Sequence, residues 1–317
     1  MALFYSLIKI MVRLALGIFC RKMVVSGRAS LSLKGPILVV ANHPNSFLDA
    51  TIIGSLFNRP VHFLARGDAF NKPWHAKLLR LLNMIPVYRL SEGKDNLPLN
   101  EGAFRRSKEV LSQNGIVLIF IEGICVNKHE LQTFKKGAAR IAFESRMKEG
   151  LHILPLAIAY DSFEQFGKHI NIQIAKPLLP DPLFPYEEEA KSIRYFNERM
   201  YAEINQRIKI PVNAKSSTTK QVLLFLPGIA GYVLHIGLYW PLKKFIGRKT
   251  KGTVFFDSVL FGTLLFLYPL YLIFLSLLLL LLHLPTTYII VIFIFHPALS
   301  WCAVQWQCGF GITLKSA

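Results

Sequence analysis

The sequence predicts an α/β domain whose mixed, largely parallel sheet is flanked by helices, with an N-terminal interfacial helix and a C-terminal transmembrane α-helical region. Short apolar runs such as Ile37–Val40 and Ile116–Ile121 indicate buried strands, and segments with helical periodicity separate them. The almost wholly apolar composition of the last third predicts the membrane helices. We therefore expect an interfacial helix at 1–22, the α/β domain at 23–210, a linker at 211–221 and a membrane-embedded region at 222–317.

The composition limits the possible partners. The 317 residues include 37 Lys and Arg against 19 Asp and Glu, so the net charge is +18, and 52% of the residues are hydrophobic. A mean hydropathy of +0.38 is high for a soluble protein. A basic and apolar chain suits an anionic bilayer or anionic small molecules. Nucleic acid is not an expected partner, because the sequence has no zinc-finger, basic-zipper or aromatic RNA-binding signature.

The four cysteines predict neither disulfides nor a metal site. Cys20, Cys125, Cys302 and Cys308 include no CxxC pair and lack a matching histidine spacing. We therefore expect no structural zinc and a reducing compartment for the α/β domain. No cleavable signal peptide is evident at the N-terminus.

Residues 2–20 are apolar but contain Lys9 and Arg13. Two cations within a full span would be costly, whereas an interfacial helix can send both side chains to the headgroups. We expect a helix lying in the cytoplasmic leaflet. A tilted span and a helix packed on the domain are the alternatives.

The stretch Ile37–Ala50 is the first candidate site. Its apolar strand stops in the turn Asn42-His43-Pro44-Asn45, and an apolar run from Phe47 to Phe57 predicts a helix. A polar turn between a strand and a helix lies at a sheet edge, where α/β proteins place functional groups. His43 occupies this turn.

Asp49 follows His43 by six positions. An imidazole can take a proton from a hydroxyl, and a carboxylate on its other ring nitrogen would orient it and stabilise the imidazolium. Such a pair suits transfer of an acyl group to an alcohol. In the structural alternative, Ser46 and Asp49 form a helix capping box and His43 is a turn residue.

Several other polar residues follow predicted strands. Arg66 follows the strand Val61–Ala65, Arg89 ends the strand Ile85–Arg89, and Glu122-Gly123 follows Ile116–Ile121. Lys135 and Lys136 precede a glycine and a predicted helix, which is a plausible anion cradle. Arg89 could equally be a solvated strand end, and the lysine pair a solvated basic turn.

The segment Asn42–Asp49 resembles the first signature block of the glycerolipid acyltransferase family, which includes glycerol-3-phosphate and 1-acylglycerol-3-phosphate acyltransferases. The usual spacing has four residues between His and Asp, and here five intervene, as in a longer variant. Ile85–Arg89 resembles the second block, Phe120–Gly123 the third, and Leu151–Ala159, with Pro155, the fourth. The four blocks occur in order within residues 20–210.

The resemblance implies a membrane-bound O-acyltransferase of phospholipid biosynthesis. It would move a fatty acyl group from acyl-CoA or acyl carrier protein to a hydroxyl of glycerol-3-phosphate or lysophosphatidic acid, without a metal or redox cofactor. The implied catalytic residues are His43 and Asp49. The implied substrate contacts are Arg89, Glu122 and Gly123 for the acceptor, with Arg66, Lys135 and Lys136 as further anion contacts.

Two other functions stay open. Ile124-Cys125-Val126 stands where the family commonly has Thr-Arg-Ser, so one phosphate partner is missing. A lyso-aminolipid or a glycan lipid is therefore an alternative acceptor. The other alternative is a non-catalytic lipid-binding or scaffold protein of the membrane.

The C-terminal third predicts the membrane topology. Prolines and glycines, including Pro227 and Gly231, favour a re-entrant or interfacial segment at 222–240, whereas 253–282 and 288–306 are long enough to span. The basic residues between 243 and 251 predict a cytoplasmic loop. We expect an integral membrane protein with a cytoplasmic active site, in a bacterial inner membrane rather than the endoplasmic reticulum. Three true spans are the alternative.

Overall fold

A computed structural model describes residues 2–88, 98–212, 217–285 and 287–306, so Arg89 lies outside the described residues. The described strands form one seven-stranded sheet in the order β1-β7-β6-β2-β5-β3-β4. Their bounds are β1 Cys20–Ser26, β2 Ile37–Ala41, β3 Val61–Arg66, β4 Met84–Val87, β5 Ile116–Phe120, β6 His152–Tyr160 and β7 Lys168–Ile174.

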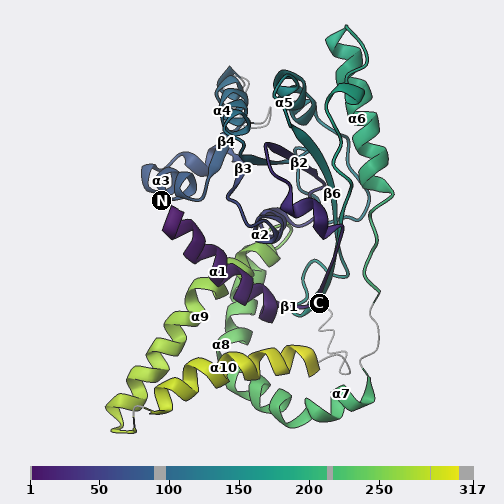
Figure 1. The fold of residues 1–317 in the computed structure, drawn as a ribbon. Helices are drawn as coiled ribbons and strands as arrows, with labels where there is room; N and C mark the ends of the chain where they lie inside the picture. Colours follow the sequence, from purple (N-terminus) through teal and green to yellow (C-terminus); the bar gives the residue numbers. More distant parts are fainter. Residues whose placement is uncertain (1, 89–97, 213–216, 286, 307–317) are drawn as a thin grey trace. The chain divides into compact units, whose positions relative to one another are not determined.

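The helices are α1 Ala2–Phe19, α2 Ser46–Leu56, α3 Pro73–Leu81, α4 Asn100–Ser112, α5 Gly137–Ser145, α6 Glu189–Asn205, α7 Thr218–Leu223, α8 Phe225–Lys249, α9 Phe256–Leu281 and α10 Thr287–Trp306. Strands and helices alternate from β2 to β6, which confirms the predicted α/β class. Figure 1 shows α2 and α3 on one face of the sheet and α4, α5 and α6 on the other. This arrangement follows from the right-handed crossovers that join parallel strands.

The centre of the sheet is parallel and fully buried. β2 pairs with β5 and β6 in parallel, and Ala41 lies opposite Phe120 on one side and Leu156 on the other. Every residue of β2 is buried, which confirms the prediction that Ile37–Val40 forms a buried strand. Because the carboxyl ends of β2 and β5 are level, the residues after Ala41 and after Phe120 leave the sheet at the same edge. This edge holds the candidate site.

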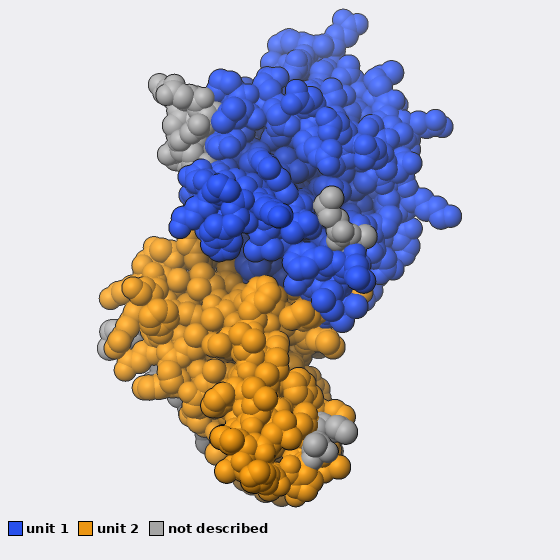
Figure 2. Space-filling model, turned by 90° about the vertical axis from the view of Figure 1, so that its left-hand side faces the viewer, with its two compact units in different colours: residues 1–10, 24–159, 171–210 blue, residues 11–23, 160–170, 211–317 orange. Residues whose placement is uncertain are grey.

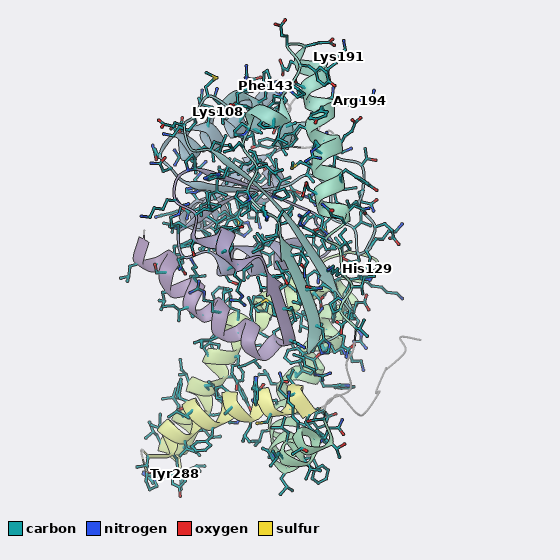
Figure 3. The ribbon with its side chains drawn as sticks, turned by 45° about the vertical axis from the view of Figure 1, so that its right-hand side comes forward. Lys108, His129, Phe143, Lys191, Arg194 and Tyr288 are labelled. Carbon is teal, nitrogen blue, oxygen red and sulfur yellow. The ribbon has the colours of Figure 1, made fainter. Side chains whose placement is uncertain are left out.

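Helix α6 shows how the main core is closed. Its residues Ile193, Phe196, Met200 and Ile204 are buried in the cluster that also contains α4, α5 and sheet residues. Its outer face carries charged side chains, among them Arg194, which forms an ion pair with Glu198. Figure 3 shows Lys191 and Arg194 on this outward side. Helix α6 is therefore amphipathic, with one apolar face in the core and one charged face outside.

The sequence predicts a first strand over Val24–Leu33, but the structure ends β1 at Ser26. Gly27 has a φ of 76° in the left-handed region, and a short 3-10 helix, Arg28–Ser32, follows it. A Cβ at Gly27 would also collide with the backbone carbonyl of Ile174. The loose alternation of apolar residues continues past this turn, so periodicity alone could not place the strand end.

The chain divides into two compact units. The first comprises residues 1–10, 24–159 and 171–210, and the second comprises 11–23, 160–170 and 211–317. Figure 2 colours them separately. All the described candidate site residues belong to the first unit.

The described part of the second unit contains three helices that are long and apolar enough to cross a membrane, namely α8, α9 and α10. They indicate that the protein associates with a membrane. Helix α8 is continuous from Phe225 through Lys249, although the sequence predicts an irregular segment at 222–240 and a basic loop after it. Pro227 lies in the first turn of this helix, where a backbone N–H is not needed. Gly231 faces α10 so closely that a Cβ would collide with the carbonyl of Leu299.

Candidate active site

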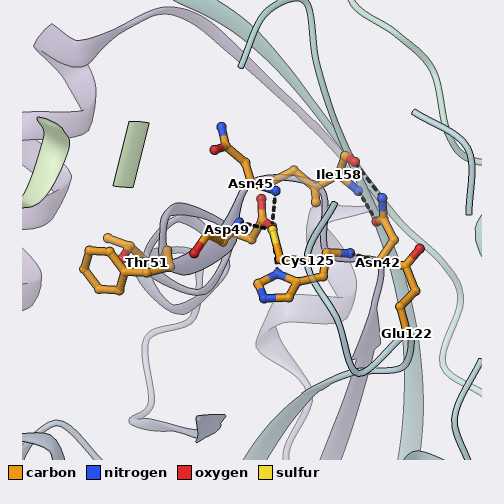
Figure 4. A network of polar contacts seen from close by, with 10 residues as sticks. Asn42, Asn45, Asp49, Thr51, Glu122, Cys125 and Ile158 are labelled. Atoms are coloured by element: carbon orange, nitrogen blue, oxygen red, sulfur yellow. Dashed lines mark hydrogen bonds and ion pairs between the residues drawn. The ribbon is translucent and has the colours of Figure 1, made fainter. Parts of the chain in front are cut away.

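The turn after β2 is anchored to the neighbouring strand β6. The side-chain amide of Asn42 donates to the carbonyl of Ile158 at 2.9 Å, and its oxygen accepts the backbone N–H of Ile158 at 2.9 Å (Figure 4). Asn42 is buried, so both polar groups of its amide are satisfied by backbone. The two hydrogen bonds hold the turn in place one residue before His43.

His43 and Asp49 form a hydrogen-bonded pair. Nδ1 of His43 lies 2.9 Å from Oδ2 of Asp49, which sits in the first turn of α2 and is fully buried. The same Oδ2 accepts the backbone N–H of Asn45 at 2.7 Å. The N-cap residue of α2 is Asn45 rather than Ser46, so the Ser46–Asp49 capping box does not form; Asp49 accepts the N–H of Asn45 and also makes the contact that would orient the imidazole.

The start of α2 accommodates the longer spacing between His43 and Asp49. Ser46 has a φ of 51°, in the left-handed region that non-glycine residues seldom adopt. Its backbone N–H points to Sγ of Cys125 at 2.9 Å. Cys125 thus supports the turn from which the helix delivers Asp49.

The imidazole of His43 is stacked on an aromatic ring and remains partly open. The ring of Phe120 lies parallel to it, with centroids 3.8 Å apart and an interplanar angle of 8°. The His43 side chain is 14% exposed. No described residue forms a hydrogen bond to its Nε2.

Glu122 is buried against the same turn. Its Oε2 accepts the backbone N–H of His43 at 2.7 Å, and its Oε1 accepts the backbone N–H of Gln132 at 2.8 Å. Burial raises the pKa of Glu122, and the two N–H donors partly oppose this shift. Both carboxylate oxygens are bonded to backbone, so Glu122 joins the His43 turn to the loop before α5.

Gly123 and Lys135 meet beside Glu122. Gly123 has a φ of 65°, and a Cβ there would lie 2.8 Å from Cγ of Lys135. The backbone N–H of Lys135 donates to Ile121 at 2.8 Å, which keeps Lys135 next to the end of β5. The side chains of Lys135 and Lys136 are exposed, and Lys136 is the N-cap residue of α5.

Arg66 lies further along the same sheet edge. It ends β3, and β5 separates β3 from β2. Its guanidinium is exposed and forms an ion pair with the carboxylate of Asp68. The structure therefore groups His43, Asp49, Glu122, Gly123 and Lys135, with Lys136 next in sequence, and places Arg66 two strands from β2.

Three supporting residues were not singled out for the site from the sequence. Asn42 and Cys125 hold the turn through backbone contacts, and Phe120 packs on the imidazole. Asn42 directly follows β2, and Phe120 is the last residue of β5. His43 and Glu122 each lie within two residues of the same strand ends. Their position at the strand ends was therefore the available signal.

The site can be compared with known proteins. The model of the family described as Acyltransferase matches residues 22–159, which include all the grouped residues. This match is confined to less than half of the chain, the segment that holds the grouped residues.

Two kinds of curated relative match the chain. One is a "Probable 1-acyl-sn-glycerol-3-phosphate acyltransferase" of Mycoplasma pneumoniae, 26% identical over 130 residues, covering 39% of this chain and 45% of the relative. Another is "Lysophosphatidylcholine acyltransferase 2" of Danio rerio, 31% identical over 139 residues, covering 44% of this chain and 24% of the relative. The chain thus spans less than half the length of these relatives.

Among solved structures, the 1-acyl-sn-glycerophosphate (LPA) acyltransferase of Thermotoga maritima is similar. It has 21% sequence identity and a TM-score of 0.47, with coverage of 64% of this chain and 78% of that one.

Proposed function

We propose that the chain is a membrane-bound acyltransferase that moves a fatty acyl group from an acyl thioester to a hydroxyl of glycerol-3-phosphate or lysophosphatidic acid. The observation that carries this proposal is the His43 imidazole, whose Nδ1 lies 2.9 Å from Asp49 and whose side chain is partly exposed at the end of β2. Two relatives are named for 1-acylglycerol-3-phosphate acylation, which agrees with this choice of acceptor.

The reaction needs one proton carrier. Nε2 of His43 takes the proton of the acceptor hydroxyl while the oxygen attacks the thioester carbonyl carbon. The tetrahedral intermediate then collapses, the carbon–sulfur bond breaks, and the imidazolium returns its proton to the leaving thiolate. Asp49 orients the ring and stabilises the imidazolium between these two transfers.

The neighbouring residues divide into positioning and binding roles. Glu122 contributes by holding the backbone of His43, and Gly123 leaves room for the backbone to approach the acceptor. Lys135, Lys136 and Arg66 supply positive charge for the acceptor phosphate or the acyl donor. Arg89, outside the described residues, is proposed as a further phosphate contact from its sequence block.

The proposed donor is acyl-CoA or acyl carrier protein, and the proposed location is the cytoplasmic face of a bacterial inner membrane. The basic residues at the end of α8, including Arg248 and Lys249, support this orientation because cytoplasmic flanks of spanning helices are rich in Lys and Arg. A lipid acceptor and a lipid product also favour a site next to the bilayer.

Cys125 favours a second candidate acceptor. It occupies the position where an arginine is common, and its thiol accepts the N–H of Ser46. An acceptor without a phosphate monoester, such as a lyso-aminolipid or a glycan lipid, would not need that arginine.

An acceptor panel tests both candidates. The purified full chain is incubated with acyl-CoA or acylated carrier protein and with glycerol-3-phosphate, lysophosphatidic acid, a lyso-aminolipid or a glycan lipid, and products are identified by mass spectrometry. We expect the fastest acylation with lysophosphatidic acid or glycerol-3-phosphate. Faster acylation of a phosphate-free acceptor would favour the second candidate, and no acylated product from any pair would contradict an enzymatic function.

A further inference from the structure

Helix α3 exposes apolar side chains that the fold does not use. Trp74 is 64% exposed and Leu78 is 40% exposed, whereas only Ala76 of this helix is buried. A tryptophan exposed to this extent is unusual on a surface that faces only water, because indole has an apolar body and one polar N–H. The amphipathic ring is well suited to a bilayer interface.

Exposed cations lie along this helix and at its start. Lys72, Lys77 and Arg80 are exposed, and α3 contains no Asp or Glu. None of the three has an ion pair with a described residue. A helix with an exposed aromatic residue, an exposed leucine and unpaired cations is typical of a segment that lies at an anionic interface.

Helix α6 in the same unit provides the contrast. Its exposed cations are balanced locally, as in the pairs Lys191–Glu188 and Arg194–Glu198. The charges on this face neutralise one another, because each cation in these pairs has a carboxylate one turn away. Among the described residues, Lys77 and Arg80 of α3 have no such partner, so their charge is free to attract an external anion.

A recess at the start of α3 adds a place for polar headgroups. Its volume is about 520 Å³, and its lining residues are Arg66, Asp68, Ala69, Asn71, Lys72 and His75. His75 also contacts the ring of Trp74 edge-on, with centroids 3.8 Å apart. The polar recess and the apolar face of α3 are therefore adjacent. The headgroup and the acyl chains of a lipid are adjacent in the same way.

We propose that α3 is a membrane-docking element of the first unit, whose partner is an anionic lipid bilayer. Trp74 and Leu78 enter the boundary between headgroups and acyl chains, and Lys72, Lys77 and Arg80 contact lipid phosphates. A bilayer is favoured over an acidic protein because the described residues include three helices of spanning length, so the chain itself would tether the first unit to a membrane, and because the net charge is +18.

Quenching of tryptophan fluorescence tests the docking. The full chain is reconstituted into anionic vesicles whose lipids carry bromine at a shallow or a deep acyl position, and the wild type is compared with Trp74→Phe. The fluorescence of the wild type minus that of Trp74→Phe gives the fluorescence of Trp74. We expect shallow bromines to quench this signal at least twofold more than deep ones, because an interfacial ring lies near the headgroups.

A matched control uses the other face of the domain. Tyr201, on α6, is 47% exposed, so Tyr201→Trp in the Trp74→Phe background introduces an exposed reporter away from α3. We expect no quenching of this reporter. Quenching of Trp74 no stronger than that of the control would overturn the proposal and leave the face to a protein partner.

A second experiment tests the contribution of the α3 cations to docking. With Lys77→Gln and Arg80→Gln combined, we expect the quenching of Trp74 in anionic vesicles to fall toward its level in zwitterionic vesicles. Equal quenching in both lipids for the wild type would show that α3 does not recognise anionic lipid and would refute that part of the proposal. Far-UV circular dichroism of each variant verifies the fold.

Discussion

Two His–Asp pairs occur among the described residues, with nearly equal N–O distances but different surroundings. His43 and Asp49 are 2.9 Å apart, and His169 and Asp161 are 2.8 Å apart, in both cases through Nδ1. The exposed fractions of the two imidazoles, 14% and 9%, are also similar. Neither distance nor exposure therefore distinguishes a candidate catalytic pair from a structural one.

The other bonds of each aspartate make the distinction. Asp161 accepts both the ring and the backbone N–H of His169, and its own N–H donates to the carbonyl of His169. All these hydrogen bonds join the same two residues, so they hold together the two ends of the loop between β6 and β7. Asp49 instead reaches from a helix to a turn whose backbone is held independently by Glu122.

The surroundings of the second pair are those of a structural core. Lys168, next to His169, is fully buried and forms an ion pair with Asp257 in the first turn of α9. Burial raises the pKa of the nearby Cys20 thiol to about 12, which keeps it protonated and unreactive. A His–Asp pair in such surroundings contributes to folding, whereas one at an open strand edge can meet a substrate.

The largest expected effect separates the two histidines. His43→Ala should lower turnover by about 10³-fold, because it removes the proton carrier. His169→Ala should keep the turnover of the wild type and lower the free energy of unfolding by about 1–3 kcal/mol, because it leaves a buried acceptor unsatisfied. Acyl-transfer rates and thermal midpoints of the two purified variants provide the measurement.

The aspartates serve as the matched controls. Asp49→Asn should reduce turnover by at least about 10²-fold, since an amide does not stabilise the imidazolium. Asp161→Asn should affect only stability. If His43→Ala retained full activity, or if both histidine variants lost activity equally, the distinction between the pairs would be wrong.

A second, smaller effect concerns the buried ion pair beside His169. Lys168→Met should destabilise the protein by about 3–5 kcal/mol, because the buried carboxylate of Asp257 loses its ammonium partner. Adding Asp257→Leu should recover most of this loss, since an apolar pair needs no compensation. Thermal denaturation in detergent checks both variants, and an unchanged midpoint in Lys168→Met would contradict the structural role of this region.

The smallest effect concerns Glu122, which supports the first pair through the N–H of His43. Because burial raises the pKa of Glu122, the native state binds its proton more tightly than the unfolded chain does. Its contribution to stability is therefore present below the ordinary pKa of 4.5 and is lost as the pH rises through the raised value.

Glu122→Gln removes this pH dependence. At low pH we expect the variant to be about 1–3 kcal/mol less stable than the wild type, because one amide oxygen replaces two acceptors for two N–H donors. The difference should shrink as the pH rises, since only the wild type loses stability. Thermal midpoints across this range measure it, and parallel pH curves for the two proteins would argue against a raised pKa.

Much of the site was predictable from local pattern. The apolar runs Ile37–Val40 and Ile116–Ile121 predicted two buried strands, so His43 and Glu122 were expected after strand ends, whereas the pairing of the two strands came only from the structure. The function of Glu122 was less predictable. Nothing in the local sequence indicates that both its oxygens accept backbone N–H groups of His43 and Gln132, because those contacts join segments that are distant in sequence.

The sequence by itself determined the α/β class, the candidate residues His43 and Asp49, and the apolar C-terminal third, because periodicity, turn chemistry and composition act over a few neighbouring residues. Only the tertiary structure decided that Asp49 meets the imidazole across five intervening residues, and that His169 and Asp161 form a second pair. The physical reason is that hydrogen bonds depend on the positions of atoms within about 3 Å, and strand order and helix entry angle set those positions.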